Sequence, residues 1–97
     1  MFDKMKQLME MKRQADQIKR ELEAEVVECE DVRGIKIVIN GAQKVRSLEV
    51  SESFLNPTNK VQLEKDLLRS VNAAITKSQY VAAQKMKSLM PGGFPGL

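Results

Sequence analysis

The sequence predicts an α+β fold in which two long helices stand at either end of a small antiparallel sheet. Three observations predict it. Residues 2–25 contain no Gly or Pro and space their apolar side chains by three or four, as in a helix. Residues 26–50 are rich in Val and Ile with a period of two, as in strands. Residues 58–90 return to helical spacing and stop before Pro91.

The chain is long enough for one small domain. It has 97 residues, of which 42% are hydrophobic and 30% are charged, a composition typical of folded proteins. We expect residues 1–90 to form a single α-β-β-β-α domain. The segment 91–97, PGGFPGL, is expected to be a flexible tail that exposes Phe94 and Leu97.

The composition argues against several classes of function. The chain has no His and one Cys, Cys29, so a His-dependent triad is excluded and neither a zinc site nor another metal site is expected. No glycine-rich phosphate loop is present. We therefore predict a protein that is not an enzyme and uses no cofactor or small-molecule substrate. The absence of a secretory h-region and of a long apolar run predicts a cytoplasmic protein with no membrane partner.

One face of the first helix is apolar. At 100° per residue, five apolar side chains fall within about 80° of one another. They form the apolar seam, which consists of Leu8, Met11, Ala15, Ile18 and Leu22. We expect the seam to pack in the core and build the fold. A helix of this length spans roughly 35 Å, which is more than a small sheet covers, so part of it should contact another surface.

The opposite face of the first helix is cationic. Five cations recur there at sevenfold spacing and form the basic ridge, which consists of Lys6, Lys12, Arg13, Lys19 and Arg20. Repeated cations without a base-reading motif are what recognition of a phosphate backbone needs. On spacing alone, an ordinary solvated face is the more common explanation of such a pattern.

Charge is also segregated along the chain. Residues 21–32 carry six acids and no cation, and no acid follows Asp66. This segregation favours an anionic partner over a merely solvated surface. The second helix offers another candidate cationic surface opposite its apolar face, made of Lys65, Arg69 and Lys87. Solubilising side chains are the alternative explanation for these three.

The start of the first helix is apolar well beyond the seam. Phe2, Met5 and Met9 lie 100° or more from the seam centre. One sheet cannot cover so broad a surface, so we predict that these three residues form a self-association interface. The alternative is a frayed helix end with adaptable Met side chains.

The segment between the helices predicts a three-stranded meander. Ile35, Ile37 and Ile39 alternate with other residues, and Gly34 is placed for the turn before them. Asn40-Gly41 predicts a hairpin turn because both residues tolerate positive φ. The uneven spacing of Val45, Leu48 and Val50 predicts a bulge or a loop longer than two residues.

The second helix is predicted to begin at a cap provided by Asn56 or Thr58 around Pro57. Its apolar residues share one broad face at helical spacing. They are Val61, Leu63, Leu67, Leu68, Val71, Ala74, Ile75, Val81, Ala82, Met86 and Leu89. Pro91 and Gly92-Gly93 are expected to end it.

The order of these segments resembles the YbaB/EbfC family of nucleoid-associated proteins. The resemblance is carried by GIKIVINGAQKVRSLEVSESFLNP, followed by LEKDLLRSVNAAITKS. It implies a homodimer with projecting helices that binds double-stranded DNA in the bacterial cytoplasm. It also implies a role in nucleoid organisation or in regulating gene expression. Asn56 and Arg69-Ser70 depart from the family pattern, and the family offers no compact DNA-contact motif to carry over.

Two other functions fit parts of the pattern. The helix–hairpin–helix order with a Met-rich helix start also fits a prefoldin-like chaperone or a coiled-coil adaptor that binds no nucleic acid. Membrane-surface binding by a basic amphipathic helix fits less well, since the apolar face lacks Trp and is needed for the fold.

Overall fold

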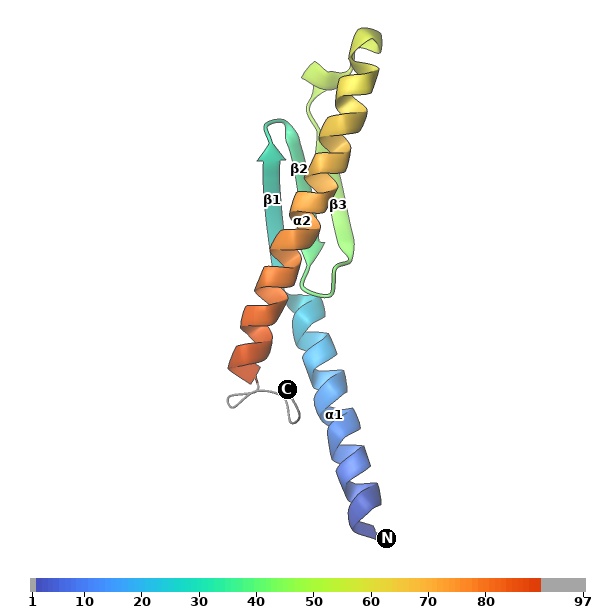
Figure 1. Ribbon diagram of the computed structural model, residues 1–97, viewed down its shortest axis with the longest axis vertical. Helices are drawn as coiled ribbons and strands as arrows, with labels where there is room; N and C mark the ends of the chain where they lie inside the picture. The colour runs from blue at the N-terminus through green and yellow to red at the C-terminus, as the bar shows by residue number, and fades with distance from the viewer. Residues whose placement is uncertain (1, 90–97) are drawn as a thin grey trace.

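The computed structural model describes residues 2–89 and confirms the predicted order of elements (Figure 1). Two long helices, α1 (Phe2–Ala24) and α2 (Lys60–Leu89), enclose three strands in sequence. The strands are β1 (Val26–Val32), β2 (Ile35–Asn40) and β3 (Val45–Val50). Two short 3-10 helices, η1 (Glu52–Phe54) and η2 (Pro57–Asn59), lead into α2. The predicted tail 91–97, including Phe94, Leu97 and the stop at Pro91 and Gly92-Gly93, lies outside the described residues.

The molecule is elongated, with extents of 67 × 20 × 18 Å. Figure 1 shows α2 crossing one face of the sheet, while α1 points away from the sheet toward the opposite end of the molecule. The C-terminal part of α2 lies beside the base of α1. The sheet and α2 therefore form the folded body, and α1 projects from it.

The sheet is an antiparallel meander in the order β1-β2-β3. The predicted irregularity in the third strand is confirmed: Val38 faces Ser47 and Ile39 faces Val45, so Arg46 is an extra residue in β3. A second irregularity, which the sequence did not predict, lies in β1 between Cys29 and Val32.

The turn between β2 and β3 differs from the predicted one. Asn40 and Gly41 do not adopt positive φ; the left-handed residue of this turn is Gln43, with φ of 63°. Asn40 organises the turn through its side chain, whose Oδ1 accepts hydrogen bonds from the backbone N–H groups of Ala42 and Lys44, each at 3.0 Å. The prediction of a turn was right, and the reason given for it was wrong.

Gly41 is needed for a close approach to α1. A Cβ at this position would lie 2.8 Å from the carbonyl oxygen of Leu22, near the end of α1. The backbone N–H of Gly41 donates to the carbonyl of Glu25 at 3.2 Å. The turn therefore supports the base of α1 directly. Gly34 is different: it has φ of 94° in the β1–β2 turn, as the sequence predicted.

The core lies between the sheet and α2. Ile35, Ile37 and Ile39 on β2 are fully buried, together with Val27 and Cys29 on β1. On α2, the fully covered side chains are three small ones at intervals of four. Ser70, Ala74 and Ser78 form this small-residue stripe. Small side chains let the helix backbone approach the sheet, and both hydroxyls are paired: Ser70 donates to the carbonyl of Asp66 and Ser78 to that of Asn40.

The prediction that the apolar seam builds the core is wrong for most of its length. Ile18 and Leu22 are half-buried, but Ala15 is exposed, Leu8 is 66% exposed and Met11 is 64% exposed. The physical reason is that α2 already covers the apolar residues of β1 and β2, and α1 extends beyond the sheet. The predicted face of α2 also needs correction, because Val61 and Leu68 are exposed while Ser70 and Ser78 are buried.

Enlarging the small-residue stripe should destabilise the fold. Ala74→Leu adds three carbon atoms where the side chain is 0% exposed, so we expect the free energy of unfolding to fall by about 1–3 kcal/mol. Urea unfolding measures this, with Ala83→Leu, at an exposed position of the same helix, as the matched control. Equal stability of the two variants would contradict the close packing of α2.

Candidate nucleic-acid interface

The basic ridge lies on the projecting helix α1. All five of its cations are exposed. Among residues 2–89, no ion pair involves any of them, whereas Lys36 pairs with Glu28 at 3.7 Å and Lys60 with Glu64 at 3.5 Å. The ridge is therefore an exposed set of cations that form no ion pair within the described residues.

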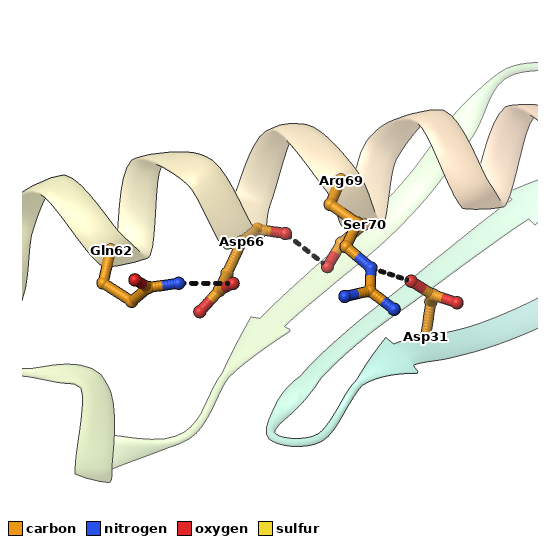
Figure 2. Close-up of polar contacts among 5 residues, drawn as sticks. All are labelled: Asp31, Gln62, Asp66, Arg69 and Ser70. Carbon is orange, nitrogen blue, oxygen red and sulfur yellow. Dashed lines mark hydrogen bonds and ion pairs between the residues drawn. The ribbon is translucent and has the colours of Figure 1, made fainter.

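The cations of α2 are in a different situation. Arg69 Nε donates to Asp31 Oδ2 on β1 at 2.8 Å, as Figure 2 shows. In the same view, Gln62 donates to the Asp66 carboxylate, and the Ser70 hydroxyl turns back to the Asp66 carbonyl. Arg69 is 69% exposed but already has an anionic partner. This ion pair reduces its capacity to attract another anion.

Lys65 and Lys87 are exposed and lie outside the ion pairs of residues 2–89. They are 22 residues apart, which corresponds to about 33 Å along a helix. The structure therefore does not bring Lys65, Arg69 and Lys87 together into one compact patch. Whether any of them contacts DNA stays a prediction.

Some of the oppositely charged segments of the sequence contact one another in the folded molecule. The acidic segment 21–32 supplies partners for three cations of the acid-free part of α2. Lys85 Nζ lies 3.4 Å from Glu21 and 3.2 Å from Glu25, and Arg69 pairs with Asp31. Lys77 Nζ donates to the backbone carbonyl of Glu28 at 2.6 Å. These contacts hold α2 against α1 and β1, and none of them involves a cation of the basic ridge.

Sequence reasoning missed two cations near the ridge. Lys44 in the β2–β3 turn and Arg46 at the β3 bulge line a surface pocket together with Lys19 of α1. The signal available in the sequence was the uneven spacing of Val45, Leu48 and Val50, which predicted a bulge or a longer loop, because bulges redirect side chains. Their proximity to α1 depends on tertiary structure and was not readable from spacing.

Two exposed apolar surfaces are present. The first lies on α1, where the predicted interface residues Phe2, Met5 and Met9 are 84%, 63% and 68% exposed. The second was not predicted and is named the β3–α2 surface: Val45, Leu48, Val61 and Leu68. Val45 and Leu48 pair with Ile39 and Ile37, so they lie on the sheet face that carries α2.

The position of α2 explains why the β3–α2 surface is open. Arg69 and Lys77 hold one flank of α2 against β1. By helical geometry, Leu68 and Val61 lie on the other flank, toward β3. α2 thus covers β1 and β2 and leaves the apolar side chains of β3 exposed.

Metal-binding clusters and membrane-spanning helices are both absent from residues 2–89. No group of three or more His, Cys, Asp or Glu side chains in this range is arranged to hold a metal ion. No helix in the same range has the length and apolar character needed to cross a membrane.

Comparison with known families identifies the chain. Residues 1–94 match the model of the YbaB/EbfC DNA-binding family. The chain belongs to this family. The match covers α1, the sheet and α2, so the family resemblance predicted from the sequence is confirmed.

Curated relatives agree with this assignment. A nucleoid-associated protein of Chloroflexus aurantiacus is 33% identical over 94 residues, covering 96% of this chain and 93% of its own length. A nucleoid-associated protein of Syntrophobacter fumaroxidans is 31% identical over 98 residues, covering 99% of this chain and 89% of its own.

A solved structure shares the fold. An uncharacterized protein from Helicobacter pylori superposes with a TM-score of 0.66 at 14% identity, covering 86% of this chain and 98% of that one. At this identity the likeness supports the α-β-β-β-α architecture alone.

Removing Lys85 should loosen the junction between α1 and α2. The hydrogen bond with Glu25, and next that with Glu21, raise the pKa of Lys85 above its ordinary value of 10.5. Its ammonium group therefore stabilises the folded state at pH values below 10.5, and this contribution is lost as the pH rises through the raised pKa. We expect Lys85→Met to lower Tm below pH 10.5 and to speed amide hydrogen exchange in residues 20–25.

Lys87→Met, which removes an exposed cation two residues further along the same helix, is the matched control. Thermal unfolding across the pH range and hydrogen exchange measure both effects. A Lys85→Met variant with the Tm and exchange rates of the control would show that the two ion pairs do not hold α1.

Proposed function

We propose that this protein is a nucleoid-associated protein that binds double-stranded DNA as a homodimer in the bacterial cytoplasm, mainly through backbone phosphates. Its role is in nucleoid organisation or in the regulation of gene expression. The observation that carries the proposal is the basic ridge: five exposed cations without carboxylate partners on a projecting helix, in a chain of a DNA-binding family. The names of the curated relatives support the nucleoid role.

The ridge is suited to the phosphate backbone rather than to base edges. Lys6, Arg13 and Arg20 recur every seven residues, or about 10.5 Å along the helix. Evenly spaced cations neutralise phosphates in any sequence. We therefore expect affinity that depends strongly on salt and weakly on DNA sequence.

The α2 cations take a smaller part in this proposal. Lys65 and Lys87 are available to phosphates, but they are far apart. Arg69 has to share its guanidinium between Asp31 and a phosphate. A long-range contribution to the positive field around the molecule is their expected effect.

The β3–α2 surface supports the homodimer. It combines exposed apolar side chains with an edge strand whose outer backbone groups lack a strand partner in residues 2–89. A second copy that covers this surface buries both features at once and leaves each α1 projecting. We propose the β3–α2 surface as the base of the dimer, and Phe2, Met5 and Met9 remain the sequence-based alternative.

One observation favours the alternative function, a chaperone or adaptor that binds no nucleic acid. Met5, Met9 and Met11 are exposed along α1, and flexible Met side chains suit adaptable apolar binding surfaces. Suppression of client aggregation at high salt, in a protein without affinity for DNA, would favour this function.

Neutralising the ridge should weaken DNA binding. In the triple variant Lys6→Gln/Arg13→Gln/Arg20→Gln we expect weaker binding to all duplexes alike. The slope of log K against log[salt] should become less steep by about 2.7, since each phosphate contact contributes about 0.9. Fluorescence anisotropy over a salt series measures both quantities.

A control triple variant, Arg33→Gln/Lys36→Gln/Lys60→Gln, changes the net charge equally at positions away from α1. If both triple variants show the same salt slope, the net charge and not the ridge governs binding. That result would contradict the proposed interface.

Placing charge on the β3–α2 surface should separate the protomers. Leu48→Asp/Leu68→Asp introduces two carboxylates at side chains that are exposed in the single chain, so the fold should persist while the dimer dissociates. Analytical ultracentrifugation gives the mass, and circular dichroism shows that the secondary structure is kept.

The comparison variant is Phe2→Ser/Met5→Ser/Met9→Ser, which removes the apolar surface at the start of α1. A monomer from this variant, with a dimer retained in Leu48→Asp/Leu68→Asp, would assign the interface to α1 and refute the β3–α2 base.

A further inference from the structure

We propose that the pocket between α1 and the β2–β3 turn binds one phosphate group of the DNA backbone. This inference rests on the proposed DNA-binding function and adds a site to it. The pocket has a volume of about 360 Å³ and an open mouth. It is lined by Lys19, Glu23, Asn40, Ala42, Lys44 and Arg46.

The charge of the lining favours an anion. Three cations reach the pocket from three elements: Lys19 from α1, Lys44 from the turn and Arg46 from β3. Glu23 is the acid of the lining, and within residues 2–89 no carboxylate lies within ion-pair distance of these three cations. Three cations against one acid leave a net positive site.

Asn40 supports the anion site independently of the charge of the lining. Its side chain is buried, with 2% exposure, and its Oδ1 accepts two backbone N–H groups, which fixes the orientation of the amide. Its Nδ2 is a buried donor without a hydrogen-bond partner within the described part of the chain. Buried polar groups are nearly always paired, so this donor, on a residue that lines the pocket, still lacks an acceptor.

The turn holds its cations in place. The backbone N–H of Lys44 donates to Asn40 Oδ1, and Gln43 adopts the left-handed conformation before it. Arg46 is the extra residue of the β3 bulge, which redirects its side chain relative to a regular strand. The carbonyl of Asn40 accepts from the Ser78 hydroxyl at 2.6 Å, which ties the turn to α2. The backbone of the site is thus built before any ligand arrives.

The pocket continues the basic ridge. Lys12 and Lys19 lie on one side of α1 at sevenfold spacing, and Lys19 is shared between the ridge and the pocket. A phosphate backbone that follows α1 toward its C-terminal end therefore meets Lys44 and Arg46 next. Continuity with the ridge favours a backbone phosphate over a free anion as the occupant.

The test uses the full chain and the variant Lys44→Gln/Arg46→Gln. Arg33→Gln/Lys60→Gln, with the same change of charge at positions outside the pocket and the ridge, is the control. For duplex DNA we expect the salt slope to become less steep by about 0.9, the contribution of one phosphate, in the pocket variant and to stay unchanged in the control. In NMR titrations with inorganic phosphate, we expect the Asn40 side-chain amide and the Lys44 amide to shift in the wild type and not in the pocket variant.

Each combination of results decides the inference. Equal DNA slopes in the pocket variant and the control overturn the backbone assignment, and phosphate-dependent shifts in that case identify a site for free anions instead. If the wild type binds no DNA, the proposed function fails, and the phosphate titration alone decides the pocket. Absence of phosphate-dependent shifts at Asn40 then refutes an anion site altogether.

Discussion

The packing of α2 on the isoleucines of β2 is the contact on which the rest of the structure depends. Ser70, Ala74 and Ser78 bring the helix backbone close to the sheet, and the covered isoleucines are fully buried. Because α2 alone buries the isoleucines of β2, α1 is not required to cover them. A chain of this size thereby gains a long helix that is free to present cations on one side and apolar residues on the other.

Electrostatic pairing within the chain decides which cations remain for a partner. The acidic segment 21–32 engages Lys85, Arg69 and Lys77 of α2 through side-chain or backbone oxygens. Within residues 2–89, no carboxylate lies within ion-pair distance of a cation of the basic ridge. The acidic segment, which would repel DNA, is therefore engaged in holding α2 against β1 and against the base of α1. Net charge alone, at +3, would not reveal this division.

Sequence patterns predicted the element order, the β3 bulge and the family, because these depend on local spacing and on the order of short segments. Sequence patterns did not predict which of several apolar surfaces packs against the sheet. The apolar seam has the spacing of a core face, yet α2 occupies the sheet. Ser70 and Ser78 look like surface residues, but their hydroxyls find backbone carbonyls and can be buried. Lys44 and Arg46 lie near Lys19 although these residues are distant in sequence, and the spacing of residues along a sequence does not predict such a contact.

Gly41 lies at the contact between the β2–β3 turn and the base of α1. Its missing side chain lets the turn lie against Leu22, so this contact, together with the ion pairs of Lys85, sets the direction of α1. A helix about 35 Å long amplifies any change there: a tilt of about 10° at the base displaces the far end by about 6 Å. In the proposed dimer, the distance between the ends of the two α1 helices would change with the tilt at their bases. A methyl group at residue 41 would press on the Leu22 carbonyl oxygen and shift the base of α1, and that shift would be largest at the far end of the helix.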